Sequence, residues 1–200
     1  MSGTTPNAYS IAILAGGHSK RMGRNKALLE INHTPILEYV IKAVTPLTSD
    51  LFLVTNQPEV YRHFHLPMVR DIMPEKAALG GLYTAISAAQ NDWILVVGCD
   101  MPLLKAEVID FMAGYLNQGD IVCPLIGVHP EPLHAFYQKT CLPFIKERLL
   151  NDQLKLTGFY EAVTVQYIDE SLLSQVTTDL NFLRNVNTPQ DFVDIQRLIG

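Results

Sequence analysis

Residues 14–26 read LAGGHSKRMGRNK and place three glycines and several cationic side chains directly after an apolar run. Glycine lets the backbone approach a ligand closely, and successive N–H groups can form an anion-binding nest. Like charges at this density repel one another unless an anion lies among them. The cations are His18, Lys20, Arg21, Arg24 and Lys26. The spacing predicts a binding loop for a small anionic ligand, with a solvated basic loop as the alternative.

Two common phosphate-binding motifs do not fit this loop. The sequence contains no G-x-G-x-x-G dinucleotide fingerprint. A Walker A loop is excluded because five residues separate Gly17 from Gly23, and Arg24 stands where that motif requires lysine. A glycine-rich turn alone indicates little, whereas the extended string L-A-G-G-x-S-x-R-M-G-x-x-K is far more specific.

A single aspartate follows the apolar stretch WILVVG of residues 93–98. Apolar side chains on both faces predict a central parallel strand. Asp100 would leave the carboxyl end of this strand toward the same rim as the glycine loop, and burying its charge is unfavourable unless it meets a cation. The alternative is that Asp100 caps the helix predicted to begin at Lys105.

Short apolar strands alternate with amphipathic helical stretches, and the rhythm loosens toward the C-terminus. Strands are predicted over 10–14, 51–55, 68–71, 93–98, 120–124, 133–137 and 162–167, and helices over 36–47, 58–64, 79–90, 105–117, 141–150 and 189–199. Thr34 is expected to cap the first helix, with Pro35 in its first turn. This pattern predicts the α/β class, as a three-layer α/β/α sandwich with a mainly parallel, Rossmann-like sheet. In such sheets ligands bind beyond the carboxyl ends of the strands.

Composition limits the classes of function. The 200 residues, 48% hydrophobic and 18% charged, predict a single domain over residues 10–200 behind a flexible tail of residues 1–9. The net charge of −5 offers no broad basic field for nucleic acid. The tail lacks an apolar signal segment, and no apolar stretch reaches the ~20 residues of a membrane span. The three cysteines lack the spacing of metal ligands. We expect a cytoplasmic protein with neither nucleic acid nor membrane as partner.

Three motifs together resemble the molybdenum cofactor guanylyltransferases, within the nucleotide-diphospho-sugar transferase-like superfamily. They are the extended loop string, the D-x-P-x-L pattern of residues 100–104 and the N-x-N-T-P-x-D pattern of residues 185–191. The resemblance runs from about residue 10 to the C-terminus, and its motifs fall in the right order at predicted strand ends. It implies a nucleotidyltransferase whose first loop wraps a nucleoside triphosphate.

The resemblance assigns roles to the loop residues. The main chain of Leu14, Ala15 and Gly16 would contact the guanine nucleotide, and the Gly16–Gly17 pair favours guanine over cytosine. Lys26 would contact the phosphates, and Arg21 would add electrostatic stabilisation, as would Lys20 and Arg24.

It also assigns roles at the other strand ends. Asn56 and Asp71 would recognise the base, with an ordinary turn residue and a helix cap as the respective alternatives. Asp100 would hold Mg²⁺, which prefers oxygen ligands and is typically bound by one or two carboxylates plus phosphate oxygens. Asn185 and Asn187 would face the substrate, although the N-T-P sequence would also cap the final helix through Thr188. Residues 129–143 would face the pterin, and His134 within them is interpreted as a packing histidine rather than a base.

The reaction implied is transfer of GMP from GTP to the terminal phosphate of molybdopterin, with release of pyrophosphate. Transient contact with cofactor-delivery proteins or molybdoenzymes is a further expectation. Three alternatives remain open from the sequence: a cytidylyltransferase for the same pterin, a sugar-phosphate nucleotidylyltransferase, and a nucleotide- or pterin-binding relative without turnover.

Two departures from the family pattern bear on activity. Many relatives have aspartate before the loop lysine, where this chain has Asn25. Relatives usually show Gly-Pro-Leu-x-Gly before the third helix, whereas Ala77 and Ala78 occupy the Gly-Pro positions here. These two departures are what keep the non-catalytic alternative open.

Overall fold

The computed structural model describes residues 9–16 and 25–200. Its strands are β1 (Tyr9–Leu14), β2 (Glu30–Ile31), β3 (Thr34–Pro35), β4 (Leu51–Val54), β5 (Met68–Val69), β6 (Trp93–Gly98), β7 (Ile121–Ile126), β8 (His129–Pro130), β9 (His134–Gln138) and β10 (Val165–Asp169). Its α-helices are α1 (Ile36–Val44), α2 (Pro58–Tyr61), α3 (Ala77–Ala88), α4 (Ala106–Ala113), α5 (Leu142–Leu150), α6 (Glu170–Leu173) and α7 (Pro189–Ile199). Short 3₁₀ turns that matter below are η1 (Lys26–Leu28) and η6 (Asn181–Leu183).

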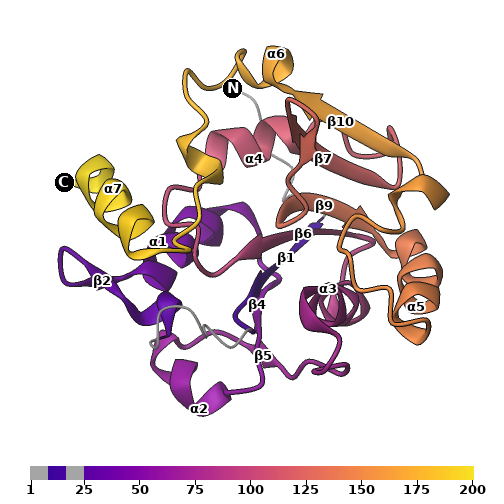
Figure 1. Ribbon diagram of the computed structural model, residues 1–200, viewed down its shortest axis with the longest axis horizontal. Coiled ribbons are helices and arrows are strands. Elements are labelled where there is room, and N and C mark those ends of the chain that lie inside the picture. Colours follow the sequence, from indigo (N-terminus) through magenta and orange to yellow (C-terminus); the bar gives the residue numbers. More distant parts are fainter. Residues whose placement is uncertain (1–8, 17–24) are drawn as a thin grey trace.

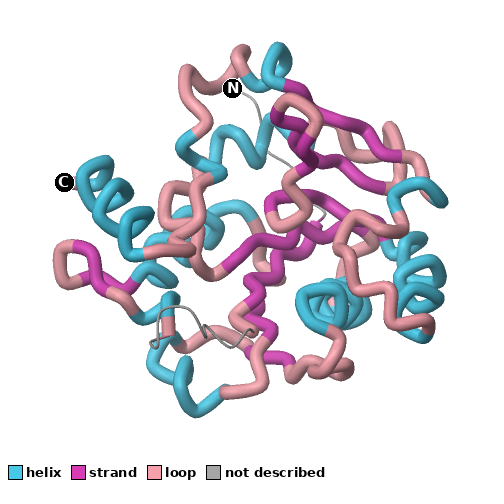
Figure 2. Tube along the Cα trace, in the orientation of Figure 1, coloured by secondary structure: helices cyan, strands magenta, loops and turns pink. Residues whose placement is uncertain are grey.

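One twisted sheet organises the molecule (Figures 1 and 2). Its strands lie in the order β10-β7-β9-β6-β1-β4-β5, and β8 pairs with the end of β7. Neighbouring strands are parallel from β6 to β5, while β9 runs antiparallel between β6 and β7. The predicted mainly parallel sheet is therefore confirmed, and β9 and the short β8 run opposite to its other strands.

Helices cover both faces of the sheet, as Figure 1 shows. Alternate residues of β1 face opposite layers: Ile11 and Ile13 pack in the cluster that contains α1 and α4, whereas Ala12 and Leu14 pack in the cluster that contains α3 and α5. All of β6 is buried, as its continuous apolar sequence predicts for a strand covered on both faces. The three-layer α/β/α sandwich is confirmed. No helix in the described ranges combines the length and the apolar character that a membrane span requires.

The start of the first helix differs from the expectation. Thr34 and Pro35 form a strand that pairs with Glu30 and Ile31, and the two residues between these strands, Asn32 and His33, have φ values of 50° and 62°. Two successive left-handed residues make the type of hairpin turn that matches the strand twist. Thr34 therefore does not cap α1, which begins at Ile36 without a side-chain cap.

Other boundaries moved by a few residues. β1 already includes Tyr9, which the sequence placed in the tail, because its buried ring packs edge-on against Phe136 with centroids 4.9 Å apart. α4 ends at Ala113 rather than Asn117, and β10 spans Val165–Asp169 rather than 162–167. Residues 1–8 of the predicted tail lie outside the described residues.

The turn before α3 places Ala77, one of the two departures from the expected pattern, in a conformation that suits glycine. Ala77 begins the helix with φ of 52°, a left-handed conformation that costs an L-residue roughly 1–2 kcal/mol. The turn also lies so close to the helix that a Cβ on Gly80 would stand 2.3 Å from the main-chain oxygen of Met73. The turn is thus built with an alanine in a conformation that suits glycine, with strain at that one residue.

We expect Ala77→Gly to raise the free energy of unfolding by up to about 1 kcal/mol, since relief of the left-handed strain exceeds the added flexibility of the unfolded chain. Urea denaturation measures the change. Ala88→Gly, at the other end of the same helix, is the matched control and should destabilise by roughly 0.5–1 kcal/mol. Equal destabilisation by both variants would contradict this explanation.

Candidate active site

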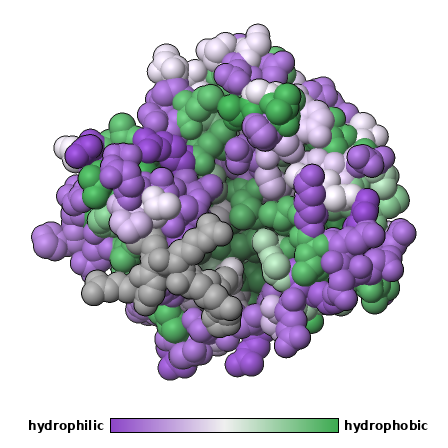
Figure 3. Space-filling model, viewed as in Figure 1, coloured by the Kyte–Doolittle hydropathy of each residue, from purple (hydrophilic) through white to green (hydrophobic). Residues whose placement is uncertain are grey.

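The carboxyl ends of four parallel strands meet at one edge of the sheet. Leu14 pairs with Val54 on one side and Gly98 on the other, and Val54 pairs with Val69. The residues that leave these strands therefore emerge side by side, in the order Asp100, Gly16, Asn56, Asp71. In the view of Figure 3, the centre of the visible face is hollowed and lined largely by apolar residues, over the ends of β1 and β6.

Asp100 bends back over the end of its own strand. One carboxylate oxygen lies 2.8 Å from the point where a Cβ on Gly98 would stand, so a larger residue at position 98 would displace this carboxylate. Burial raises the pKa of Asp100, and the positive charge of Lys26 opposes that rise. The carboxylate is thus partly desolvated. Among the described residues, Lys26 is the cation that stabilises its charged form.

Lys26 reaches this point from η1. Its Nζ donates a 2.9 Å hydrogen bond to Oδ1 of Asn187, from the far end of the sequence. The preceding residue, Asn25, accepts a 3.2 Å bond from the amide of Ala27 and donates a 2.8 Å bond from Nδ2 to the hydroxyl of Tyr61. Asn25 therefore caps η1 and ties the lysine turn to α2, a structural role that an aspartate could also fill by accepting from the tyrosine hydroxyl.

The segment of residues 185–188 lies against the Asp100 loop. The amide of Val186 donates a 2.9 Å bond to the carbonyl of Asp100. Thr188 caps α7 in a capping box with Asp191, so the predicted cap is confirmed. That cap does not involve the side chain of Asn187, which binds Lys26 instead. Asn185 is half-buried on the other side of Val186.

The two predicted base-recognition residues lie on the opposite side of Gly16 from Asp100. Asp71 uses one carboxylate oxygen to accept from the amide of Met73 at 2.9 Å and the hydroxyl of Thr84 at 2.8 Å. Within residues 9–16 and 25–200, its second oxygen accepts no hydrogen bond. Asn56 is exposed beside it, at the end of β4. Thr84 fixes the aspartate, and the sequence alone did not identify it.

The first loop is described only at its ends. The Leu14 carbonyl accepts from the amide of Cys99 at 3.2 Å, and the Ala15 amide donates to the Val54 carbonyl at 2.9 Å, so both groups already take part in the sheet. Gly16 is exposed, and no described heavy atom lies within 4 Å of a Cβ built on it. Among the described residues, no neighbour excludes a larger side chain at position 16. Gly17 and Arg21 lie outside the described residues, as do Lys20 and Arg24.

The donor set at this edge fits a magnesium ion that arrives with a nucleotide. In the described part of the chain, no three His, Cys, Asp or Glu side chains cluster as a metal site. A lone, partly desolvated carboxylate such as Asp100 matches the way Mg²⁺ is usually held, by one or two carboxylates with phosphate oxygens completing the shell.

Comparison with known proteins agrees with this geometry. The sequence pattern of the MobA-like NTP transferase domain matches residues 11–165. The chain belongs to this family. It is 36% identical over 191 residues, 96% of either chain, to a probable molybdenum cofactor guanylyltransferase of Carboxydothermus hydrogenoformans. It is 31% identical to a protein of the same description from Clostridium perfringens, over 93% of this chain and 95% of that one.

Solved structures show the same fold. Molybdopterin-guanine dinucleotide biosynthesis protein A from Archaeoglobus fulgidus superposes with a TM-score of 0.85 at 21% identity, covering 95% of this chain and 98% of that one. A putative protein from Aquifex aeolicus superposes with a TM-score of 0.77 at 26% identity, covering 93% and 97%. The MobA-like chain therefore shares its fold with these proteins over 93% or more of its length, which is more than the residues 11–165 that the family pattern matches.

His134 of this MobA-like chain is a packing residue, but not a hydrogen-bonded one. It is fully buried, and its ring packs edge-on against Phe182 with centroids 5.2 Å apart. Neither ring nitrogen has a hydrogen-bond partner among the residues that the structure describes. Burial lowers the pKa of His134 to about 3, so the ring is neutral at physiological pH.

Some contributors at the site were not predictable from local pattern. Tyr61 holds Asn25, Thr84 holds Asp71, and the amide of Val186 holds the Asp100 loop. A main-chain amide carries no residue-type signal, and Tyr61 and Thr84 each look like ordinary helix residues. Only the spatial neighbours reveal these three roles.

We expect His134 to make the free energy of unfolding depend on pH. The unfolded chain binds a proton near the ordinary pKa of 6.5, whereas the folded protein does not until about 3, so stability falls as pH falls through this window. Between pH 7 and pH 5 the loss from this group is about 2 kcal/mol. Urea unfolding of His134→Leu at both pH values should show a correspondingly smaller loss than the parent protein.

The control for that measurement is His63→Leu, at an exposed histidine next to Phe64. It should retain the pH dependence of the parent. If His134→Leu lost as much stability as the parent between pH 7 and pH 5, the buried neutral histidine would not be the cause.

Proposed function

We propose that this MobA-like protein transfers GMP from GTP to the terminal phosphate of molybdopterin, forming the guanine dinucleotide form of the cofactor and pyrophosphate. The observation that carries the proposal is the convergence of Lys26, Asp100 and Asn187 at the carboxyl edge of the sheet. The names of the relatives at 31% and 36% identity over nearly the whole chain support the same activity.

The length of this sheet edge, and the order of the residues along it, suit a nucleoside triphosphate. Strand neighbours lie ~4.8 Å apart, so the three steps from β5 to β6 span about 14 Å. We place the base at the β4–β5 end and the phosphates at the β1–β6 end, with Gly16 between them. Support comes from the distribution of charge, because Lys26 lies at the phosphate end, whereas at the other end the second oxygen of Asp71 accepts no hydrogen bond from a described residue.

Guanine recognition is assigned to Asp71 and Asn56. A carboxylate can accept paired N–H donors from guanine, and cytosine does not present that pair in the same way. The bonds from Met73 and Thr84 fix the orientation of Asp71 before any ligand binds, which lowers the ordering cost of recognition.

At the phosphate end the chain contributes charge and position. The Lys26 ammonium, held by Asn187, would bind triphosphate oxygens and lower the repulsion between the two anionic reactants. The attacking group is a phosphate, already anionic at neutral pH, so the transfer requires no strong general base. Catalysis then consists of alignment and electrostatic stabilisation, as in other phosphoryl-transfer enzymes.

We propose that Asp100 binds Mg²⁺ together with the triphosphate. When bound, the ion would supply charge neutralisation on the phosphate oxygens. The raised pKa of Asp100 supports this role, because a desolvated carboxylate is stabilised by a bound cation.

The acceptor is placed on the β9–β7 side of Asp100. A hollow of about 390 Å³ lies there, between the β7–β8 hairpin and residues 155–157, and His129 and Lys155 line it together with apolar residues. Such a mixture suits a flat heterocycle that carries an anionic group. A partner protein that delivers or receives the cofactor is also part of the proposal.

The test is transfer of label from [α-³²P]GTP or [α-³²P]CTP to Mo-molybdopterin, with Mg²⁺ present. We expect GTP to be used roughly 10²-fold more efficiently than CTP, because the wrong base leaves Asp71 unpaired. Asp100→Asn should lower the rate with GTP roughly 10³-fold or more while leaving the melting temperature equal to or above that of the parent.

Asp92→Asn is the matched control, since Asp92 precedes the same strand at the opposite edge of the sheet and is exposed. It should transfer at the parental rate. Preference of the parent for CTP would contradict guanylyl transfer, and full activity of Asp100→Asn would contradict the role of Asp100.

A further inference from the structure

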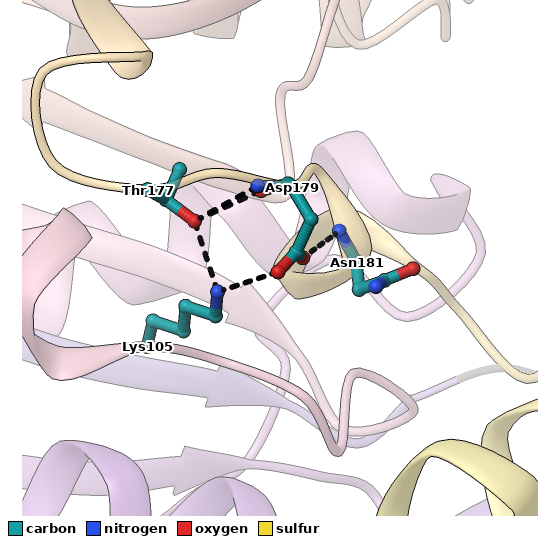
Figure 4. Close-up of polar contacts among 4 residues, drawn as sticks. All are labelled: Lys105, Thr177, Asp179 and Asn181. Atoms are coloured by element: carbon teal, nitrogen blue, oxygen red, sulfur yellow. Dashed lines mark hydrogen bonds and ion pairs between the residues drawn. The ribbon is translucent and has the colours of Figure 1, made fainter.

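Lys105 makes a set of polar contacts that neither the helix it precedes nor the transfer site described so far accounts for (Figure 4). Its Nζ donates to the hydroxyl of Thr177 at 2.9 Å and to Oδ2 of Asp179 at 3.0 Å. The same hydroxyl donates to the carbonyl of Asp179, and the other carboxylate oxygen of Asp179 accepts from the amide of Asn181 at 2.8 Å. Thr177 is buried, and the ion pair is largely shielded on the lysine side, where 28% of the side chain is exposed.

Lysine is an unfavourable residue for its position in the chain. Lys105 is the N-cap of α4 and makes no side-chain cap. Serine, threonine, aspartate and asparagine are preferred at N-caps, and a cation near a helix N-terminus opposes the helix dipole. The side chain of Lys105 therefore does not serve the helix, and its observed partners all lie 72 or more residues away in sequence.

Those partners begin the segment that reaches the phosphate end of the site. Asp179 binds the first turn of η6, in which Phe182 is buried against His134. Four residues after Phe182, the amide of Val186 bonds to the carbonyl of Asp100, and the next side chain, Asn187, holds Lys26.

The loop of residues 99–105 is thus attached at both of its ends to the segment of residues 177–187. At one end the attachment is the bond from Val186 to Asp100, and at the other it is the ion pair of Lys105 with Asp179. Between these ends, the loop, which the structure describes in full, makes one main-chain hydrogen bond with itself. It is weak, and it runs from the amide of Leu104 to the carbonyl of Met101 at 3.4 Å.

We propose that Lys105 is a positioning residue for nucleotidyl transfer, which holds the Asp100 loop and the Asn187 segment in one fixed arrangement through Thr177 and Asp179. This inference rests on the proposed function. Lys105 acts through Asp100 and Asn187 and does not itself touch the triphosphate. A small displacement of aligned groups costs a large part of the rate. Among the described residues, no hydrogen bond joins the base end of the site, on β4 and β5, to this segment.

The test compares Lys105→Met, Lys105→Arg and the parent by steady-state kinetics and by amide hydrogen exchange at Val186. In Lys105→Met we expect kcat to fall roughly tenfold while the KM for GTP stays within about twofold, because alignment at the phosphates is lost and base binding is kept. The Val186 amide should exchange roughly tenfold faster, since the segment opens more readily. Lys105→Arg should restore both values to within about threefold of the parent.

Lys42→Met is the matched control, because Lys42 forms an exposed ion pair with Glu38 within α1. It should change neither kcat nor Val186 exchange. Asp179→Asn combined with Lys105→Met should be no slower than the slower single variant, as expected for two residues that act through one contact.

Parental kcat in Lys105→Met would overturn the inference, and so would parental exchange at Val186. Absence of GMP transfer by the parent would instead refute the proposed function. The exchange measurement still tests the contact between the two segments in that case, because parental exchange at Val186 in Lys105→Met would show that Lys105 does not hold them together.

Discussion

The structure depends on one electrostatic constraint, the placement of a carboxylate at the end of a strand that is buried on both faces. Asp100 emerges from β6 into surroundings that disfavour its charge, and Gly98 leaves the space into which it bends. The groups that make this position tolerable come from distant parts of the chain. Lys26 supplies charge from the first loop, and Val186 fixes the main chain of Asp100 from the last one.

The sheet places Asp100 at one end of a row of strand ends. Because β6, β1, β4 and β5 are parallel and in register, their ends form a row with Asp100 and Lys26 at one end and Asp71 at the other. The turn before α3 sets the second end of the row. It packs so tightly that Gly80 touches the main chain of Met73, whose amide in turn fixes Asp71. Ala77 holds that turn in a left-handed conformation that glycine would adopt without strain.

Much of this arrangement could be predicted because it is encoded locally. The continuous apolar sequence of β6 identifies a central strand, and parallel strands bring the residues that follow them to one edge. Contacts between distant segments could not be predicted. Lys26 and Asn187 are 161 residues apart, and Lys105 and Asp179 are 74 apart, so no local pattern links either pair. The hairpin at Asn32 and His33 was missed for a different reason, since two left-handed residues without glycine give a weak turn signal.

The central claim is that Lys26 and Asp100 act together on one triphosphate, and a double-mutant cycle on kcat for GMP transfer tests it most directly. Each of Lys26→Ala and Asp100→Asn should lower kcat by at least roughly 10²-fold. Because groups that act as a unit are strongly non-additive, the double variant should be within about tenfold of the slower single variant. If the two losses instead multiplied in full, Lys26 and Asp100 would act independently, and the shared phosphate site proposed for them would be wrong.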